Sequence, residues 1–326
     1  MRVLYVGGTG EISTACVEAA LRAGQQVTVF NRGNDAEALP AGVEHVCGDV
    51  ADDAAYAALA RRGFDAVCQF IAFGPEDVRR DYSTFAGHCG QYLFVSSASV
   101  YQKPCPSLPI TEETPLGNPF WDYAQRKIAC ERALLEAAQD GALPVTIVRP
   151  SHTYRTRLPS TVIDGHHLAW RLLRNKPVPV HDGGESVWTL THASDFARAF
   201  VALCGLDAAR GETVHITRNQ AHSWRSILQA SADLLGVEAD IVPIPTPAVV
   251  AALADLAGPL YGDKANSLIF DTHRIEALVP DWRCEVSLAD GVAEVWRIAE
   301  ARQRAGYAPD AAMDALVDGL IEAHGH

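Results

Sequence analysis

Long apolar runs and positive charge are both scarce in this chain of 326 residues. No apolar run approaches the roughly 20 residues that a membrane-spanning helix needs, so no membrane partner is expected. Only 27 lysine and arginine residues stand against 40 aspartate and glutamate residues, for a net charge of -13. Proteins that bind long nucleic acids usually have a basic face, so no nucleic-acid partner is expected either.

The eight cysteines form no CxxC pair and no cluster with histidine. They are therefore expected to be reduced, mostly buried thiols, as in a cytoplasmic protein. His166 and His167 lack cysteine or carboxylate partners at ligand spacing, so no metal site is predicted. The N-terminal MRVLYVGG enters a strand directly and leaves no room for a secretory signal, which also favours a cytoplasmic location.

What the chain does have is an alternation of short apolar runs and helical patterns in its first half. The runs are VLYV, VTVF, VEHVC, FDAVCQFIAF, YLFVSS and VTIVR. Their near-continuous apolarity predicts buried parallel strands, and hence an α/β fold with a Rossmann-type doubly wound sheet. After Arg149 proline, histidine and glycine become frequent, which predicts a smaller substrate-binding lobe. The expected division is a cofactor-binding domain at residues 1–150 with a returning segment at about 187–217, and a lobe at 151–186 and 218–326.

The segment VLYVGGTGEISTACVEAAL predicts a strand, a glycine turn and a helix. Gly7, Gly8 and Gly10 would let backbone N–H groups and the helix N-terminus bind a pyrophosphate, although a simple tight turn would have the same pattern. Glu11 and Ser13 stand where an apolar residue and a glycine are usual. Because Glu11 would repel the pyrophosphate, we expect it to point toward the substrate side and to hydrogen-bond a hydroxyl or a neighbouring backbone group.

The second and third predicted strands end in residues that could hold the adenosine part of a dinucleotide. Asn31 and Arg32 follow the second strand, where a site that prefers NAD usually has a carboxylate. An arginine there suits a 2′-phosphate and favours NADP over NAD, although a solvated arginine after a strand is also common. Asp49 and Val50 follow the third strand and could bracket the adenine, but Asp49 could equally cap a helix.

Tyr123 and Lys127 are four residues apart in a predicted helix that begins near Phe120, so they project from one face. A tyrosine near pKa 10 needs a nearby cation to act as an acid or base at neutral pH, and Lys127 would supply it. The alternative is a surface pair on an amphipathic helix. Ser97 leaves the fifth strand at the edge where ligands bind and could hydrogen-bond a substrate oxygen beside Tyr123.

These landmarks, taken in order, are GGTGEI, SSASVY, YAQRK, VRP and THASDFARAF. Together they resemble the extended short-chain dehydrogenase/reductase family of NAD-dependent epimerase/dehydratase type. The resemblance implies a catalytic set of Ser97, Tyr123 and Lys127, a nicotinamide pocket lined by Pro150, Ser151 and His152, and a homodimer. The candidate cofactor-binding residues are Gly7, Thr9, Gly10, Glu11, Ile12, Asn31, Arg32, Asp49, Val50, Phe70, Ala72, Tyr123, Lys127, Pro150 and His152. The candidate substrate-binding residues are Ser97, Ser99, His152 and Trp188, although Ser99, like Ser96, is also interpreted as structural.

The chain departs from nucleotide-sugar members of that family at the diphosphate. Trp188 stands where an arginine is usual, and PLYGDK lacks a second one. A buried diphosphate without cations is costly, so a standard UDP-sugar substrate is disfavoured unless Lys264, Arg155 or Arg157 substitutes. His152 is a candidate second acid or base, with loop packing as the alternative.

The leading hypothesis is an NAD(P)-dependent enzyme that acts at a secondary alcohol or ketone of a sugar-like, possibly nucleotide-linked, small-molecule substrate. Epimerisation, dehydration and ketone reduction all begin with or consist of this hydride step. One alternative is an NADP-dependent reductase of a non-sugar metabolite, in which Trp188 forms an apolar stacking wall. Another is a non-catalytic binding or regulatory module.

Overall fold

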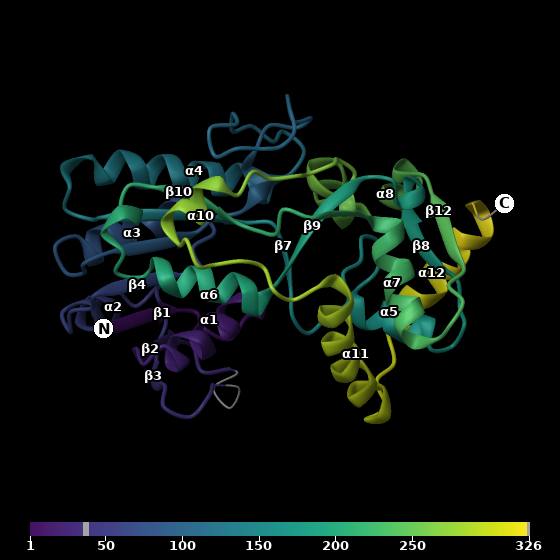
Figure 1. Cartoon of the computed structure of the whole chain (residues 1–326), viewed down its shortest axis with the longest axis horizontal. Helices are drawn as coiled ribbons and strands as arrows, with labels where there is room; N and C mark the ends of the chain where they lie inside the picture. The colour runs from purple at the N-terminus through teal and green to yellow at the C-terminus, as the bar shows by residue number, and fades with distance from the viewer. Residues whose placement is uncertain (35–38, 325–326) are drawn as a thin grey trace.

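A seven-stranded parallel sheet forms the larger part of the molecule in the computed structural model, which describes residues 1–34 and 39–324 (Figure 1). The strand order is β10-β6-β5-β4-β1-β2-β3. The strands are β1 (Arg2–Val6), β2 (Gln26–Asn31), β3 (Glu44–Cys47), β4 (Ala66–Gln69), β5 (Tyr92–Val95), β6 (Val145–Pro150) and β10 (Thr213–Ile216). The predicted doubly wound α/β sheet is confirmed, and β10 adds a strand beyond those of the first half of the chain.

Both faces of the sheet are covered because successive side chains of each strand point in opposite directions. Val3 and Tyr5 of β1 pack on one side with helices α1 (Glu11–Arg22) and α6 (Ala193–Leu203). Leu4 and Val6 pack on the other side, which α2 (Asp53–Ala60), α3 (Pro75–Phe85) and α4 (Asp122–Ala137) cover. This double burial explains why the strands read as continuous apolar runs rather than alternating ones.

The strand order reverses at β1, which pairs with β2 on one side and with β4 on the other. Val6, at the end of β1, is in register with Phe30 of β2 and Gln69 of β4. In open α/β sheets, ligands bind beyond the carboxyl ends of the strands at such a reversal. The glycine turn that follows β1 lies at this point.

The smaller lobe contains two short sheets and several helices. A three-stranded sheet has the order β11-β9-β7 and a two-stranded sheet pairs β12 with β8. The strands are β7 (His152–Tyr154), β8 (Val178–His181), β9 (Val187–His192), β11 (Ala221–Ser223) and β12 (Ile241–Ile244), and the main helices are α5 (Gly165–Leu172), α7 (Trp224–Leu235), α8 (Thr246–Ala252), α11 (Leu288–Arg304) and α12 (Ala311–His324). Within the segment 187–217, β9 joins the lobe, whereas α6 and β10 return to the large sheet.

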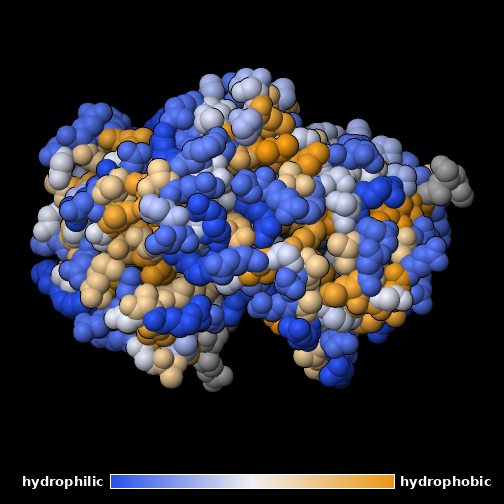
Figure 2. Space-filling view, viewed as in Figure 1, coloured by the Kyte–Doolittle hydropathy of each residue, from blue (hydrophilic) through white to orange (hydrophobic). Residues whose placement is uncertain are grey.

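Two short segments connect the lobe with the sheet domain. Helix α9 (Ala257–Pro259) continues into a π-helical turn, η7 (Leu260–Lys264), and α10 (His273–Leu278) packs Ile275 into the core beside α1 and α6. Figure 2 shows a mostly hydrophilic surface with scattered apolar residues on the face that it draws. None of the described helices is both long and apolar enough to cross a bilayer. All eight cysteines are free thiols, and Cys16, Cys68, Cys130 and Cys204 are buried.

Candidate functional site

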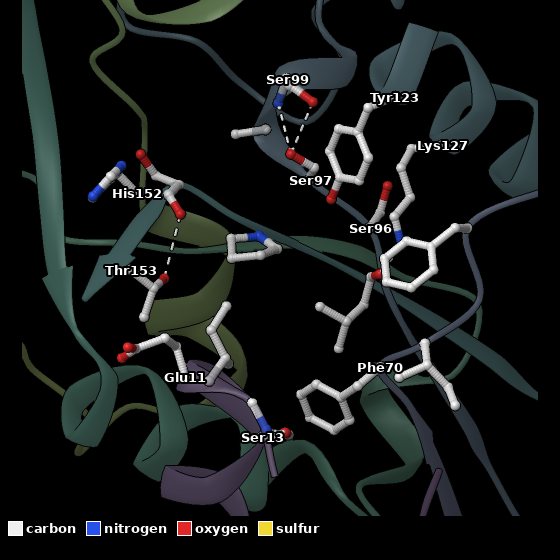
Figure 3. Close-up of a pocket in the computed structure, with 18 of the residues that line it drawn as sticks. Glu11, Ser13, Phe70, Ser96, Ser97, Ser99, Tyr123, Lys127, His152 and Thr153 are labelled. Carbon is white, nitrogen blue, oxygen red and sulfur yellow. Dashed lines mark hydrogen bonds between the residues drawn. The ribbon is translucent and has the colours of Figure 1, made fainter. Parts of the chain in front are cut away.

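A cavity of about 560 Å³ opens beyond the carboxyl ends of β1, β4, β5 and β6, between the sheet and the lobe (Figure 3). Its lining includes the turn after β1, the serines after β5 and the first residues of β7. A second pocket of about 380 Å³ lies at the ends of β2 and β3. The two pockets share Gly7, Thr9, Ile71 and Phe73, so they form adjoining parts of one groove along the sheet edge.

The glycine turn leaves little room for a side chain at Gly7 and Gly8. Gly7 and Gly8 have φ angles of 111° and 99°, which residues with a Cβ atom rarely adopt. A Cβ atom on Gly8 would lie 2.8 Å from Val29, and one on Gly7 would lie 3.1 Å from Ile71. Helix α1 begins directly after Gly10, so its first N–H groups lie at the end of this turn. The turn therefore fits the pyrophosphate of a dinucleotide.

Glu11 turns its carboxylate away from the turn and toward the loop that follows β7. The backbone N–H of Thr156 donates to Glu11 Oε2 at 2.9 Å, and the Thr156 hydroxyl donates to Oε1. Arg157 Nε lies 4.0 Å from the same carboxylate. The predicted bonding to a hydroxyl or neighbouring backbone group is thus observed within the chain. Ser13 accepts a hydrogen bond from the N–H of Gly10 at 2.9 Å, a bond that a glycine could not accept.

At the end of β2, Asn31 and Arg32 both line the second pocket. The Asn31 amide donates to the Gly7 carbonyl at 3.0 Å, and its oxygen accepts the Gly33 N–H at 2.8 Å. Because both ends of its side chain are engaged, Asn31 supports the glycine turn as well as lining the pocket. Arg32 is the exposed cation at this end of the groove.

Asp49 and Val50 also line the second pocket. Asp49 Oδ1 accepts the N–H of Ala51 at 2.9 Å in a local turn. The alternative that Asp49 caps a helix is wrong, because Asp52 caps α2 by accepting the N–H groups of Ala54 and Ala55. Both candidate adenine-binding residues therefore lie at the pocket, and Asp49 has no competing capping role.

Ser97, Tyr123 and Lys127, the three residues of the predicted catalytic set, all line the larger cavity. The phenol of Tyr123 points toward Ser97 (Figure 3). Burial raises the pKa of Tyr123, a hydrogen bond with Ser97 opposes the rise, and the charge of Asp263 adds to it. Ser97 Oγ lies 2.9 Å from Ser99 Oγ and accepts the Ser99 N–H at 3.1 Å. Because its pKa lies above the ordinary value of about 10, Tyr123 is a protonated phenol at neutral pH.

Lys127 is buried beside Tyr123, with its ammonium 5.9 Å from the centre of the Tyr123 ring. Its Nζ donates to the carbonyl oxygens of Ala72 at 2.8 Å and Val95 at 2.9 Å. An ammonium has three N–H groups, so one remains for the cavity. Burial lowers the pKa of Lys127 to about 8. Ala72, expected to contact the cofactor, does not line either pocket; it is buried and supplies the carbonyl that holds Lys127.

The serine segment after β5 is anchored through Ser96, which also lines the cavity, to buried polar groups behind it. Ser96 Oγ donates to Glu131 at 2.5 Å, and Glu131 in turn pairs with Arg149 at 2.6 Å. Arg149 also donates to the hydroxyl of Tyr101 at 2.8 Å, and this hydroxyl contacts His215 Nε2. The bond from Ser96 to Glu131 supports a structural role for this serine.

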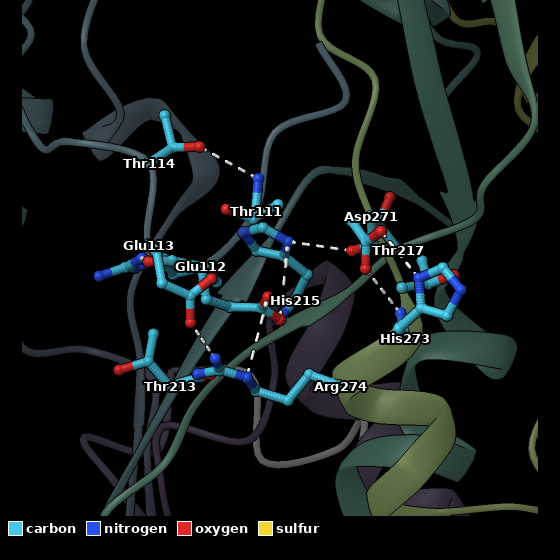
Figure 4. A network of polar contacts seen from close by, with 12 residues as sticks. Thr111, Glu112, Glu113, Thr114, Thr213, His215, Thr217, Asp271, His273 and Arg274 are labelled. Carbon is cyan, nitrogen blue, oxygen red and sulfur yellow. Dashed lines mark hydrogen bonds and ion pairs between the residues drawn. The ribbon is translucent and has the colours of Figure 1, made fainter. Parts of the chain in front are cut away.

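A polar network around His215 joins β10 to two neighbouring segments (Figure 4). The His215 N–H donates to Glu112 Oε1 at 2.9 Å, and Arg274 pairs with Glu113 and, at 3.4 Å, with Glu212. Burial lowers the pKa of His215 to about 3, so the ring is neutral. The network fixes the segment that follows the serines against β10 and α10.

His152 and Trp188 line the cavity from the lobe side. The His152 ring packs edge-on against Trp224 at 5.5 Å and against Trp188 at 6.4 Å. Burial, followed by the charge of Lys264, lowers the pKa of His152 to about 3. A neutral ring with so low a pKa is a weak base, which favours the loop-packing interpretation. Trp188 is 2% exposed, and its indole N–H donates to the Asn266 carbonyl at 2.9 Å.

The remaining predicted residues are placed as follows. Gly7, Thr9, Gly10, Glu11, Ile12, Phe70, Ser99, Pro150 and Ser151 line the larger cavity. Of the three cations suggested as substitutes at a diphosphate, only Lys264 lines it; Arg155 pairs with Glu18 at 2.8 Å and Arg157 with Asp164 at 3.2 Å. His167 contacts Asp314 at 2.8 Å. Within residues 1–34 and 39–324, no three histidine, cysteine, aspartate or glutamate side chains are grouped to hold a metal ion.

The lining residues that were not predicted include Trp121, Asp263 and Phe73. Trp121 is two residues before Tyr123, and its ring packs on the tyrosine ring at 4.9 Å. Asp263 belongs to PLYGDK, a segment in which the sequence indicated only a missing arginine. No local pattern connects η7 with α4, so only the tertiary fold brings Asp263 into the cavity that Tyr123 lines.

The comparisons with known proteins agree with this geometry. A family model described as the NAD dependent epimerase/dehydratase family matches residues 3–216. The chain is 29% identical over 287 residues to 2'-dehydrokanamycin reductase from Streptomyces kanamyceticus, and the match covers 87% of this chain and 80% of that protein. It is 27% identical over 248 residues to the chloroplast stem-loop binding protein of 41 kDa b from Arabidopsis thaliana, covering 71% of this chain and 62% of that protein.

Among solved structures, an epimerase from Methanothermobacter thermautotrophicus is similar in fold. Its TM-score is 0.78 over 93% of both chains, at 17% sequence identity. The family model spans most of the chain, from β1 to β10, and includes the glycine turn, the serine segment and α4. The chain belongs to the NAD dependent epimerase/dehydratase family and is an enzyme of the extended short-chain dehydrogenase/reductase type.

Proposed function

We propose that this enzyme transfers a hydride between a nicotinamide cofactor and the ketone or secondary alcohol carbon of a sugar-like substrate, with ketone reduction as its main direction. The observation that carries the proposal is that Ser97, Tyr123 and Lys127 line one cavity together with the glycine turn. The match to a 2'-dehydrokanamycin reductase over 87% of the chain supports reduction rather than epimerisation or dehydration.

The residues suggest a division of roles. When bound, the nicotinamide supplies the hydride. Ser97 hydrogen-bonds the substrate oxygen, and Tyr123, which is a neutral phenol at neutral pH, donates a proton to it. Lys127 stabilises the phenolate that remains, and its free N–H can hold a ribose hydroxyl.

The charges of the cavity bear on the substrate. Among the described residues, the lining contains two cations, Lys127 and Lys264, and no arginine. Lys127 is already engaged with two carbonyl oxygens. A diphosphate buried there would lack the bidentate partners that stabilise such groups, so a sugar-like substrate without a nucleotide diphosphate fits better. The Trp121 and Trp188 rings provide apolar walls.

The cofactor in this proposal is NADP. Arg32 lines the second pocket at the end of β2, where it can pair with a 2′-phosphate. No carboxylate occupies positions 31 or 32 to accept hydrogen bonds from a free 2′-hydroxyl.

The proposal is tested with purified protein and a panel of keto sugars, by following NADPH oxidation. Tyr123→Phe should lower kcat by about 100-fold or more, because it removes the proton donor. Tyr82→Phe, which removes a phenol outside the cavity, is the matched control and should leave kcat unchanged. Activity that persists in Tyr123→Phe would contradict the mechanism.

A second measurement separates reduction from internally balanced reactions. A reductase releases its nucleotide, whereas an epimerase or dehydratase regenerates and often retains it. We expect protein purified without added cofactor to carry little nucleotide when analysed by mass spectrometry. Stoichiometric bound NAD would contradict both the direction and the cofactor preference.

The non-catalytic alternative is favoured only by the name of the stem-loop binding relative. The net charge of -13 and the complete set of Ser97, Tyr123 and Lys127 oppose it.

A further inference from the structure

Asp263 is a buried carboxylate that the proposed reaction does not use. It lies in η7, lines the larger cavity and is 9% exposed. Its Oδ1 atom is buried and has no hydrogen-bond partner in the described part of the chain. A buried polar atom without a partner is costly, and a buried charge without one is more so. The cavity therefore contains an acceptor whose partner is missing from the protein itself.

The position of Asp263 is fixed by its neighbours. The Asn118 amide donates to the carbonyl of Gly262 at 2.7 Å and to that of Ser99 at 2.8 Å. A Cβ atom on Gly262 would lie 2.8 Å from Trp121, so this glycine allows η7 to approach the tryptophan closely. Asn118 is 2% exposed. The backbone next to Asp263 is therefore held against the serine segment and Trp121.

The charged groups around Asp263 define where its ligand would sit. Burial raises the pKa of Asp263 to about 6, and the charges of Lys264 and Lys103 oppose the rise, so the group is ionised at neutral pH. Neither lysine forms an ion pair with it among the described residues. The charge of Asp263 raises the pKa of Tyr123, whereas that of Lys264 lowers the pKa of His152. The negative charge thus acts on the Tyr123 side of the cavity and the positive charge on the His152 side.

We propose that Asp263 binds a protonated amine of the substrate, close to the carbon whose oxygen Tyr123 protonates. An ammonium would supply both the hydrogen bonds and the charge that the buried carboxylate lacks. Trp121, which packs on Tyr123, lines the same cavity as Asp263. The substrate class is then an amino-substituted cyclic ketone or alcohol. This inference rests on the proposed function, since it names the substrate class of the same site.

A neutral hydroxyl is the competing partner for Asp263, and a matched pair of probes separates the two. trans-2-Aminocyclohexanol and trans-1,2-cyclohexanediol have the same six-membered ring. They differ at one substituent, which is an amine in the first compound and a hydroxyl in the second. Their dissociation constants are measured by ligand-observed NMR titration of protein saturated with NADP⁺ at neutral pH. We expect the aminoalcohol to bind about 10-fold or more tightly than the diol, as for a hydrogen bond between charged groups.

The variants assign that preference to Asp263. Asp263→Asn should abolish it, whereas Asp255→Asn, which changes an exposed aspartate nearby and outside the cavity, should retain it. Asp263→Ser is the second variant should Asp263→Asn fail to fold, as checked by circular dichroism. Equal binding of the two probes to the unmodified protein, including no measurable binding of either, overturns the inference. So does a preference that survives both substitutions of Asp263.

Failure of the proposed function gives a different result. Tyr123→Phe should keep the preference for the amine, because the readout is binding. If Tyr123→Phe keeps full reductase activity while Asp263→Asn loses the preference, the proposed mechanism fails and the amine site stands. If Tyr123→Phe is inactive and Asp263→Asn keeps the preference, the mechanism stands and the amine site fails.

Discussion

At the scale of single residues, Lys127 carries the clearest consequence for activity. Its pKa is lowered to about 8 by burial, so its ammonium loses a proton as the pH rises through that value. In the proposed mechanism this charge stabilises the phenolate left on Tyr123, so kcat/KM for ketone reduction should fall above about pH 8. Lys127→Arg keeps the charge at all accessible pH values, and the falling limb should move upward.

The control for this pH profile is Lys176→Arg, because Lys176 pairs with Asp314 in the lobe and does not line the cavity. Its alkaline limb should coincide with that of the unmodified enzyme. An alkaline limb that stays in place in Lys127→Arg would show that another group titrates there.

Arg32 gives a residue-scale prediction about the cofactor. Arg32→Ala should weaken NADP⁺ binding by about 10-fold or more and leave NAD⁺ binding nearly unchanged, because only NADP⁺ has the 2′-phosphate. Both dissociation constants are measured by isothermal titration calorimetry. Arg79→Ala removes an exposed arginine of α3 that does not line either pocket, and should change neither constant. Equal losses for the two nucleotides would contradict the preference.

The sequence identifies residues whose chemistry is local and misses those that depend on the tertiary fold. Tyr123 and Lys127 follow from their spacing on one helix. Asn31 has the right position for cofactor binding, but its amide is engaged with Gly7 and Gly33, which the sequence does not reveal. Asp263 reaches the cavity only because η7 packs against Trp121 through Gly262.

At the scale of elements, the turn between β1 and α1 requires a glycine at position 8 for two reasons, its positive φ angle and its close approach to Val29. The φ angle of 99° is strained for any residue with a Cβ atom, and that atom would lie 2.8 Å from Val29. Gly8→Ala should therefore destabilise the fold by about 1–3 kcal/mol and weaken cofactor binding. Urea unfolding and nucleotide titration measure the two effects.

Gly63→Ala is the matched control for this substitution. Gly63 also has a positive φ, of 67°, but a Cβ atom there would meet nothing within 4 Å. Gly63→Ala should lower the free energy of unfolding by about 1 kcal/mol through backbone strain alone, and it should leave nucleotide binding intact. Equal effects of the two substitutions would mean that the contact with Val29 is not limiting.

The elements of the sheet domain were predictable because double burial imposes continuous apolar runs on its strands. The elements of the lobe were less predictable. Strands β7 and β11 have three residues each, too few for a periodic pattern, and their pairing with β9 joins segments distant in sequence. The segment 187–217 divides between the two parts, because β9 pairs in the lobe whereas β10 pairs with β6.

At the scale of the whole molecule, the glycine turn is tied to the lobe by side chains of α1. Glu11 bonds to Thr156, and Glu18 pairs with Arg155 at 2.8 Å. Glu11 and Glu18 thus connect helix α1, which follows the glycine turn, with the loop that follows β7.

Helix α12 is joined to the rest of the lobe by a partly buried ion-pair cluster, which gives the last prediction. Asp314 pairs with Arg171, which is 0% exposed, and at 2.6 Å with Lys176. Partial burial acts to raise the pKa of Asp314, but these partners and His167 outweigh it and lower the pKa to about 2. Because this value lies below that of the unfolded chain, the contribution to stability is present above about pH 4 and is lost as the pH falls toward about 2.

Asp314→Asn leaves Arg171 with Asp318 alone and should lower the free energy of unfolding at neutral pH by about 3 kcal/mol. Urea unfolding at neutral pH and at about pH 3 should show the difference between the two proteins shrinking with acid. Glu322→Gln changes another acidic residue of the same helix that forms no ion pair among the described residues, and it should match the unmodified chain throughout. A difference for Asp314→Asn that does not depend on pH would assign its effect to packing rather than to charge.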